Sequence, residues 1–280
     1  MKLLLILVLL CSTSFISQAS DKIIWYAFHN PPAFILSGPD KGKGYIDLVQ
    51  QLVIDSLPQY QHENREVTIK RLIQDMKAGL PVCFAAITKT QDRKHYISFS
   101  SESLVSPNLQ IIIKKQKADR LKLENKIDLE DMFTLHQLTM SKQIARAHGQ
   151  LIDGILQRHA QYINDRVNDS AFSHFKMLEK DRVDFLIALP SVANYTLSQL
   201  KNPSQYRTIK IKGVEQFRVG YIGCSKNAWG EAVISDINLA LKKIKTTNEY
   251  LQALTMWLTP EDLNHEFYRY FLNEFVRNED

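Results

Sequence analysis

The chain has 280 residues, a formal net charge of +5, and a hydrophobic fraction of 45%. This length is enough for two lobes of ordinary domain size. The two densest positive clusters, residues 114–117 and 242–245, contain no interleaved aromatic residues. The charge pattern therefore argues against a nucleic-acid-binding groove and is typical of solvated faces.

The N-terminus has the three parts of a secretory signal peptide. Lys2 provides a charged head, residues 3–10 form a short apolar core, and Ser17-Gln18-Ala19 is a small-residue cleavage site. The apolar core is too short to span a bilayer, so it does not predict an anchor. Cys11 follows Leu10, where a lipoprotein site requires a small residue. We therefore expect residues 1–20 to be removed near Ala19 or Ser20, and the mature protein to lie in the periplasm.

Strand and helix patterns alternate along the mature chain. The first part predicts a strand at 23–27, a helix at 44–57, a strand at 65–70, a short helix at 72–79 and a buried strand at 82–87. The middle predicts strands at 109–114, 133–140, 183–188 and 206–211, with helices at 144–156 and 172–178. The last part predicts a strand at 217–223, helices at 229–245 and 250–258, and a final helix from Thr259 to Val276. This alternation predicts an α/β fold whose sheets are mostly parallel and covered on both faces.

The end of the buried strand and the residues after it contain side chains that can bind a ligand. This stretch reads Ala85-Ala86-Ile87-Thr88-Lys89-Thr90-Gln91-Asp92-Arg93 and places hydroxyls and a guanidinium at the carboxyl edge of a sheet. Open α/β sheets bind small ligands at that edge. We therefore expect a ligand site at this edge.

Residues 85–100 resemble the signature of family 3 of the type II periplasmic solute-binding proteins, whose best-known members bind polar amino acids. Residues 25–53 are similar to the family's first strand, Pro-Pro-aromatic loop and G-x-G-aromatic-x-D-L helix, and residues 233–258 to its closing helices. Val82-Cys83, the R-x-x-G of Arg146 to Gly149, and Gly223-Cys224-Ser225-Lys226 resemble an uncharacterised subgroup.

The resemblance implies a two-lobed fold, each lobe a mostly parallel sheet flanked by helices. Lobe 1 would comprise 21–112 and 217–280, the latter with the C-terminal helices, and lobe 2 would comprise 113–216. The implied function is closure on a small polar or anionic ligand, amino-acid-like or another carboxylate, by hinge motion. The implied partners are an ABC permease or a membrane sensor. We expect a monomer without a cofactor.

The resemblance implies that Thr88 and Arg93 of lobe 1 bind the carboxylate of the ligand. A guanidinium binds a carboxylate well because it donates two parallel hydrogen bonds to it. The alternative for Arg93 is an ion pair with Asp92 or another surface acid. Phe34 and Trp25 either cover the ligand or belong to the core. Ala86 completes the expected lobe 1 site.

In lobe 2 we expect Ser141, just before a predicted helix, either to face an anion together with free backbone amides or simply to cap that helix. Arg146 would lie in the same helix, pointing to the cleft or to solvent. Amino-acid binders of the family place an aspartate at the end of a lobe 2 strand, where this chain has Ala188 or Leu189. An unpartnered buried ammonium costs several kcal/mol. The sequence therefore favours an anionic or aromatic small molecule, or a peptide-like fragment, over an ordinary α-amino acid.

Two cysteines remain after processing, Cys83 and Cys224. An oxidising compartment permits one disulfide between them, and two buried free thiols are the alternative. Neither has a Cys or His at metal-ligand spacing. No phosphate-binding glycine loop, His-Glu-x-x-His pair or nucleophile elbow is present, so we do not expect an enzyme. An enzyme on the same scaffold, as the cyclohexadienyl dehydratases are, and a scaffold that acts by protein contacts without a ligand remain the alternatives.

Overall fold

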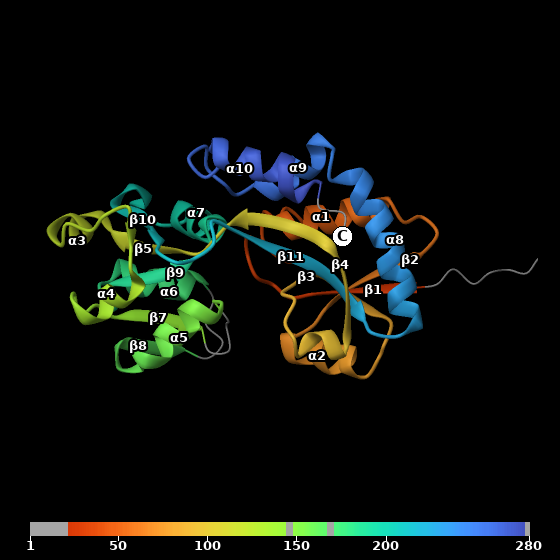
Figure 1. Cartoon of the computed structure of the whole chain (residues 1–280), viewed down its shortest axis with the longest axis horizontal. Helices are drawn as coiled ribbons and strands as arrows, with labels where there is room; N and C mark the ends of the chain where they lie inside the picture. The colour runs from red at the N-terminus through yellow and green to blue at the C-terminus, as the bar shows by residue number, and fades with distance from the viewer. Residues whose placement is uncertain (1–21, 144–147, 167–170, 278–280) are drawn as a thin grey trace, which may run out of the picture.

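The computed structural model describes residues 22–143, 148–166 and 171–277 (Figure 1). In this part of the chain two sheets, each flanked by helices, form two lobes that lie side by side. The expected signal peptide lies outside the described residues. None of the helices within the described ranges is both long and apolar enough to cross a membrane.

Lobe 1 is built on a five-stranded sheet with the order β2-β1-β3-β11-β4. Its strands are β1 (Lys22–Ala27), β2 (Gln61–Glu66), β3 (Val82–Ile87), β4 (Ile97–Pro107) and β11 (Phe217–Ser225). Its helices are α1 (Tyr45–Asp55), α2 (Ile69–Lys77), α8 (Ala228–Ile244), α9 (Asn248–Thr255) and α10 (His265–Tyr270), with a 3₁₀ turn at Arg93–His95 and a π turn at Phe271–Phe275. Strand β1 runs parallel to β2 and β3, whereas β11 is antiparallel to β3 and β4.

Lobe 2 is built on a six-stranded sheet with the order β6-β10-β5-β9-β7-β8. Its strands are β5 (Gln110–Lys114), β6 (Lys126–Ile127), β7 (Met140–Gln143), β8 (Ile163–Arg166), β9 (Phe185–Ala188) and β10 (Tyr206–Ile211). Its helices are α3 (Lys115–Arg120), α4 (Leu129–Thr134), α5 (Gln150–Arg158), α6 (Ala171–Glu179) and α7 (Pro190–Ser198), with 3₁₀ turns at Ala160–Tyr162 and Pro203–Gln205. Strand β7 is parallel to β8 and β9, so their carboxyl ends lie at the same edge.

The chain crosses between the lobes twice. It leaves lobe 1 between Pro107 and Gln110 and returns between Ile211 and Phe217. The two crossings are hydrogen-bonded, since the backbone N–H of Asn108 donates to the carbonyl of Gln216 at 3.0 Å. Residues 110–112, which the sequence grouped with lobe 1, form part of β5 in the lobe 2 sheet.

The beginning of α1 shows how a sequence motif fixes local structure. The Asp47 carboxylate accepts hydrogen bonds from the backbone N–H groups of Gly44, at 3.0 Å, and Ile35, at 2.8 Å. One side chain therefore satisfies a free amide at the helix start and anchors the preceding loop. Helix α1 then buries Ile46 and Val53 against the lobe 1 core.

Three sequence predictions are wrong. The strand expected at 65–70 ends at Glu66, because Thr68 caps helix α2 and residues 69–70 belong to that helix. Residues 133–140 were expected to form a strand, but Phe133 belongs to α4 and only Met140 reaches β7. The Asp128 carboxylate accepts from the N–H of Glu130 and caps α4, and the buried side chains of Leu129 and Phe133 follow helical spacing.

The final helix does not begin at Thr259. The carboxylate of Asp262 accepts from both the N–H and the hydroxyl of Thr259, and these bonds close a local turn. Helix α10 begins six residues further on, where the side chain of Asn264 accepts from the N–H of Phe267.

Cys83 and Cys224 form a disulfide. They occupy directly paired positions on the antiparallel strands β3 and β11, and both side chains are fully buried. Of the two alternatives that the sequence left open, the structure shows the disulfide, which ties the strand that leads to Thr88 to a strand that returns from lobe 2.

Candidate functional site

The carboxyl end of β3 brings two predicted site residues together. Strand β3 is buried up to Ile87, and Thr88 is the first exposed residue after it. The Arg93 guanidinium donates from Nη1 to the carbonyl oxygen of Thr88 at 3.0 Å, and the Arg93 N–H donates to the hydroxyl of Thr90 at 3.3 Å. The loop and the 3₁₀ turn therefore hold the guanidinium beside the end of the strand.

Arg93 takes part in no ion pair within the described ranges. The Asp92 carboxylate, considered above as its partner, accepts instead from the hydroxyl of Tyr96 at 3.2 Å. Lys89 adds a second cation to this edge, with its ammonium 5.2 Å from the ring centre of Tyr221. This end of lobe 1 presents hydrogen-bond donors and positive charge to solvent.

The two predicted aromatic residues lie in the core. The ring of Phe34 is 1% exposed and packs against Phe28 and Phe84, with ring centres 6.3 and 5.5 Å away. Trp25 is fully buried, and its indole N–H donates to Nδ1 of His62 at 3.0 Å. Neither ring is accessible to a ligand in this arrangement. Ala86, on β3, is half-buried.

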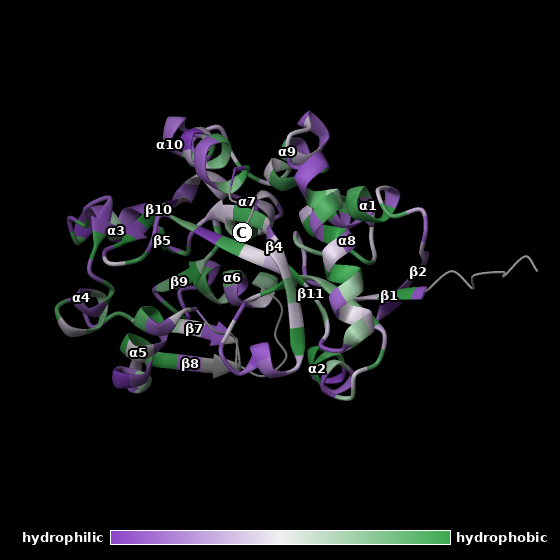
Figure 2. Cartoon of the chain, turned by 45° about the vertical axis from the view of Figure 1, so that its right-hand side comes forward, coloured by the Kyte–Doolittle hydropathy of each residue, from purple (hydrophilic) through white to green (hydrophobic). Residues whose placement is uncertain are grey.

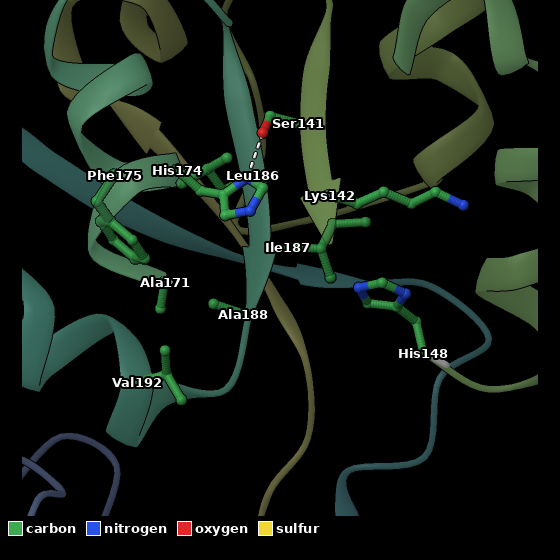
Figure 3. A pocket seen from close by; sticks show the side chains of 10 residues that line it. All are labelled: Ser141, Lys142, His148, Ala171, His174, Phe175, Leu186, Ile187, Ala188 and Val192. Atoms are coloured by element: carbon green, nitrogen blue, oxygen red, sulfur yellow. Dashed lines mark hydrogen bonds between the residues drawn. The ribbon is translucent and has the colours of Figure 1, made fainter. Parts of the chain in front are cut away.

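A pocket opens in lobe 2 at the carboxyl ends of β7 and β9 (Figure 3). Its empty volume is about 360 Å³, part of it open to solvent. Helix α6 supplies one wall and the first turn of α7 another. The lining residues are Ser141, Lys142, His148, Ala171, His174, Phe175, Leu186, Ile187, Ala188 and Val192.

Ser141 lies inside β7 and not at the start of a helix. Its hydroxyl is hydrogen-bonded to Nδ1 of His174 on α6, and both side chains are buried (Figure 3). The following helix, α5, begins only at Gln150. Arg146, expected in that helix, lies outside the described residues.

The start of α5 also differs from the expected anion site. The Asp153 carboxylate accepts from the backbone N–H groups of His148, at 3.0 Å, and Gly149, at 3.1 Å. Gly149 has a φ of +103°, a conformation that favours glycine. Because Asp153 already accepts from these amides, the helix start is closed by its own carboxylate.

Asp184, at the opposite end of β9, has a structural role. Its carboxylate forms an ion pair with Lys117 and accepts from the N–H and hydroxyl of Thr139, at 2.7 and 2.9 Å. Burial opposes ionisation of Asp184, but the Lys117 ammonium and the two Thr139 donors outweigh it and hold the pKa of the carboxyl below its usual value. Asp184 is therefore unavailable to the pocket.

Sequence reasoning missed most of this pocket. None of Lys142, His148, His174 and Phe175 was predicted as a site residue. They come from two segments, 142–148 and 174–175, and the pairing of β7 with β9 and the packing of α6 against both strands bring these segments to one edge. Ser141 was singled out, but for a helix start that the structure does not contain.

No protein-family model matches the sequence, and no curated protein matches it either. Solved structures do match. An ancestral arginine-binding protein bound to arginine is 18% identical with a TM-score of 0.63, over 86% of this chain and 99% of that one. The probable amino-acid ABC transporter extracellular-binding protein ytmK from Bacillus subtilis is 14% identical with a TM-score of 0.66, over 85% and 97%. The VFT2 domain of Bordetella pertussis BvgS is 16% identical with a TM-score of 0.59, over 85% and 92%.

Identities this low show the fold and nothing finer. The chain has the two-lobed α/β fold of the type II periplasmic binding proteins, as the sequence predicted. Open α/β sheets bind ligands at the carboxyl ends of their strands. The end of β3 and the pocket of lobe 2 are therefore the two halves to be considered together.

Proposed function

We propose that the protein is an extracytoplasmic solute-binding protein whose two lobes close on a small ligand that carries a carboxylate. The observation that carries this proposal is the Arg93 guanidinium, which is held against the carbonyl of Thr88 without a carboxylate partner in the described part of the chain. A guanidinium positioned in this way donates charge-assisted hydrogen bonds to an incoming carboxylate.

In the proposed site Thr88 and Arg93 bind the carboxylate from lobe 1, and Ala86 lies behind them on β3. Ser141 contributes from lobe 2 through the pocket. The proteins of like fold include one bound to arginine and one named as a probable amino-acid ABC transporter binding protein, which supports delivery to an ABC permease as the purpose. The proposed location is the periplasm, after removal of residues 1–20.

A thermal-shift screen of the purified protein tests this proposal. The panel contains amino acids, small carboxylates, aromatic acids and short peptides. A ligand at about 100 times its dissociation constant stabilises a protein by about 2.7 kcal/mol, which moves the melting midpoint by several degrees.

Arg93→Ala is the informative variant, and Lys94→Ala is its control because Lys94 is an exposed cation in the same turn. We expect Arg93→Ala to abolish the shift and Lys94→Ala to leave it intact. A ligand that stabilises Arg93→Ala as well as the parent would contradict the assignment, and so would a panel without any stabilising carboxylate.

A further inference from the structure

The polar side chains that line the lobe 2 pocket share one property, which is that each can donate a hydrogen bond. Those of its described lining are the Ser141 hydroxyl, the Lys142 ammonium and the imidazoles of His148 and His174. All four can donate a hydrogen bond, and no carboxylate is among the described residues that line the pocket. The chemistry of this lining suits an acceptor on the ligand.

Two described carboxylates that lie close to the pocket in the chain already have partners in the fold. Asp184 is bound by Lys117 and Thr139 before β9, and Asp153 accepts from the backbone amides of His148 and Gly149. Among the described lining residues a ligand ammonium would meet hydrogen-bond donors and the Lys142 ammonium, and the nearby Asp153 carboxylate is already in contact with the His148 imidazole, Oδ1 to Nδ1 3.3 Å. Burying such a group without a partner is strongly unfavourable.

The remaining walls are apolar. Phe175 of α6 and Val192 of α7 flank the pocket, and Leu186 of β9 completes the wall (Figure 3). These side chains are between 2% and 7% exposed. They give the pocket a small apolar wall, which suits contact with an aliphatic or aromatic group. Ala188, at the end of β9, leaves space where a larger polar side chain would reach the ligand.

We infer that the ligand is a 2-oxo or 2-hydroxy acid with an aliphatic or aromatic side chain, and that Ala188 and Ser141 select it against the matching α-amino acid. This inference rests on the proposed function. The ligand carboxylate binds Arg93 and Thr88, the apolar body enters the lobe 2 pocket, and the oxo or hydroxyl oxygen lies towards the hydrogen-bonded pair of Ser141 and His174.

Matched compounds that differ in one substituent test the inference. Isothermal titration calorimetry of the purified protein uses two sets of compounds. One set is leucine, 4-methyl-2-oxopentanoate and 2-hydroxy-4-methylpentanoate, and the other is phenylalanine, phenylpyruvate and phenyllactate. Within each set the side chain and the carboxylate stay the same, and only the substituent on the second carbon changes from an ammonium to an oxygen. We expect the oxo or hydroxy acid of at least one set to bind tenfold or more tightly than its amino acid, because a site whose polar groups do not match a substituent discriminates strongly.

The outcomes separate the two proposals. An amino acid that binds as tightly as its oxo acid, and loses binding in Arg93→Ala, would overturn the inference and keep the proposed function. If none of these compounds binds but the wider screen finds another carboxylate whose binding requires Arg93, the inference is overturned and the proposed function is kept. Absence of any carboxylate ligand would overturn both.

A substitution at Ala188 provides the second test. Ala188→Asp places a carboxylate in the pocket, and Ala188→Asn is the matched control with the same shape and no charge. We expect Ala188→Asp to shift the ratio of amino-acid to oxo-acid affinity at least tenfold towards the amino acid, and Ala188→Asn to shift it much less. Equal shifts in both variants would contradict the role of charge. Because Ala188 is buried, circular dichroism first establishes that both variants fold, and the titrations of the parent protein stand without them.

Discussion

The indole ring of Trp257 packs edge-on against the phenol ring of Tyr195, with 4.8 Å between ring centres. Tyr195 belongs to α7 of lobe 2, whereas Trp257 follows α9 of lobe 1, so this contact joins the lobes apart from the two crossings. Asn194, also on α7, donates to the carboxylate of Asp262 at 2.8 Å and to the carbonyl of Trp257 at 3.2 Å. The Trp257 N–H donates in turn to the carbonyl of Lys43 at 3.1 Å.

We expect this contact region to oppose the lobe closure that the proposed function requires. Figures 1 and 2 show α7 and α10 on one side of β4 and β11, and α6 and β7 on the other. A rotation that closes the lobes over the end of β7 therefore moves α7 away from the segment around Trp257, on the opposite side of the strands. We expect the bonds of Asn194 to be lost in that motion and therefore to stabilise the open arrangement.

We expect Asn194→Ala to raise ligand affinity several-fold, because a hydrogen bond that favours the open arrangement contributes about 1 kcal/mol. Titration calorimetry measures the affinity, and small-angle scattering of the ligand-free protein measures compactness. Gln199→Ala, an exposed position at the end of the same helix, is the control and should change neither. A weaker affinity in Asn194→Ala would show that the contact favours the closed arrangement.

Much of the fold was predictable from the sequence because long periodic patterns dominate it. Helix α8 and strand β3 lie within two residues of their predicted bounds. The failures occurred where a cap outweighed the apolar pattern. Asp128 begins a helix in a stretch whose apolar residues suggested a strand, and Asp262 closes a turn in a stretch that resembled a helix start.

The candidate site was less predictable than the fold. Thr88 and Arg93 are neighbours in the chain, so a local motif was enough to pair them. Ser141 and His174 are brought together by tertiary structure, and no spacing in the sequence signals their hydrogen bond. For Trp25 the sequence offered the core and the cleft as alternatives, and the structure shows it in the core.

The disulfide is expected to stabilise the fold substantially. Cys83 and Cys224 are 141 residues apart, so their bond closes a long loop in the unfolded chain and restricts it. We expect the Cys83→Ala, Cys224→Ala double variant to lose about 2–5 kcal/mol of unfolding free energy. Denaturant titrations of the parent with and without reductant measure the same effect. Thiol labelling of the unfolded, unreduced protein that finds two free cysteines would contradict the bond.

Gly44 is required at the start of α1 because there is no space for a side chain. A Cβ at this position would lie 2.3 Å from the carbonyl oxygen of Ala33, which is a backbone atom and cannot move alone. We expect Gly44→Ala to lower the unfolding free energy by about 1–3 kcal/mol. Lys43→Ala, at the adjacent exposed position, should change it by less than about 0.5 kcal/mol. If the Gly44→Ala protein is as stable as the parent in denaturant titration, the close approach of position 44 to the Ala33 carbonyl is refuted.

Asp184 should matter for stability in a pH-dependent way and not for ligand binding. The pKa of its carboxyl is lowered in the folded protein by Lys117 and Thr139, against the effect of burial. A lowered folded-state pKa means that the stabilisation is complete above the unfolded value of about 4 and is lost as the pH falls through the folded value. Asp184→Asn should therefore cost about 1–3 kcal/mol at pH 7, with the difference from the parent shrinking in acid.

Asp181→Asn is the matched control for Asp184→Asn. Asp181 pairs with Lys114 at 2.7 Å, but its side chain is 62% exposed, and exposed ion pairs contribute at most about 1 kcal/mol. Urea titrations of the three proteins at pH 7 and pH 3 compare the two positions directly. A cost of Asp184→Asn that is the same at both pH values would mean that the Asn side chain removes packing and not charge, because only the loss of a charge can vanish when the parent carboxyl is protonated.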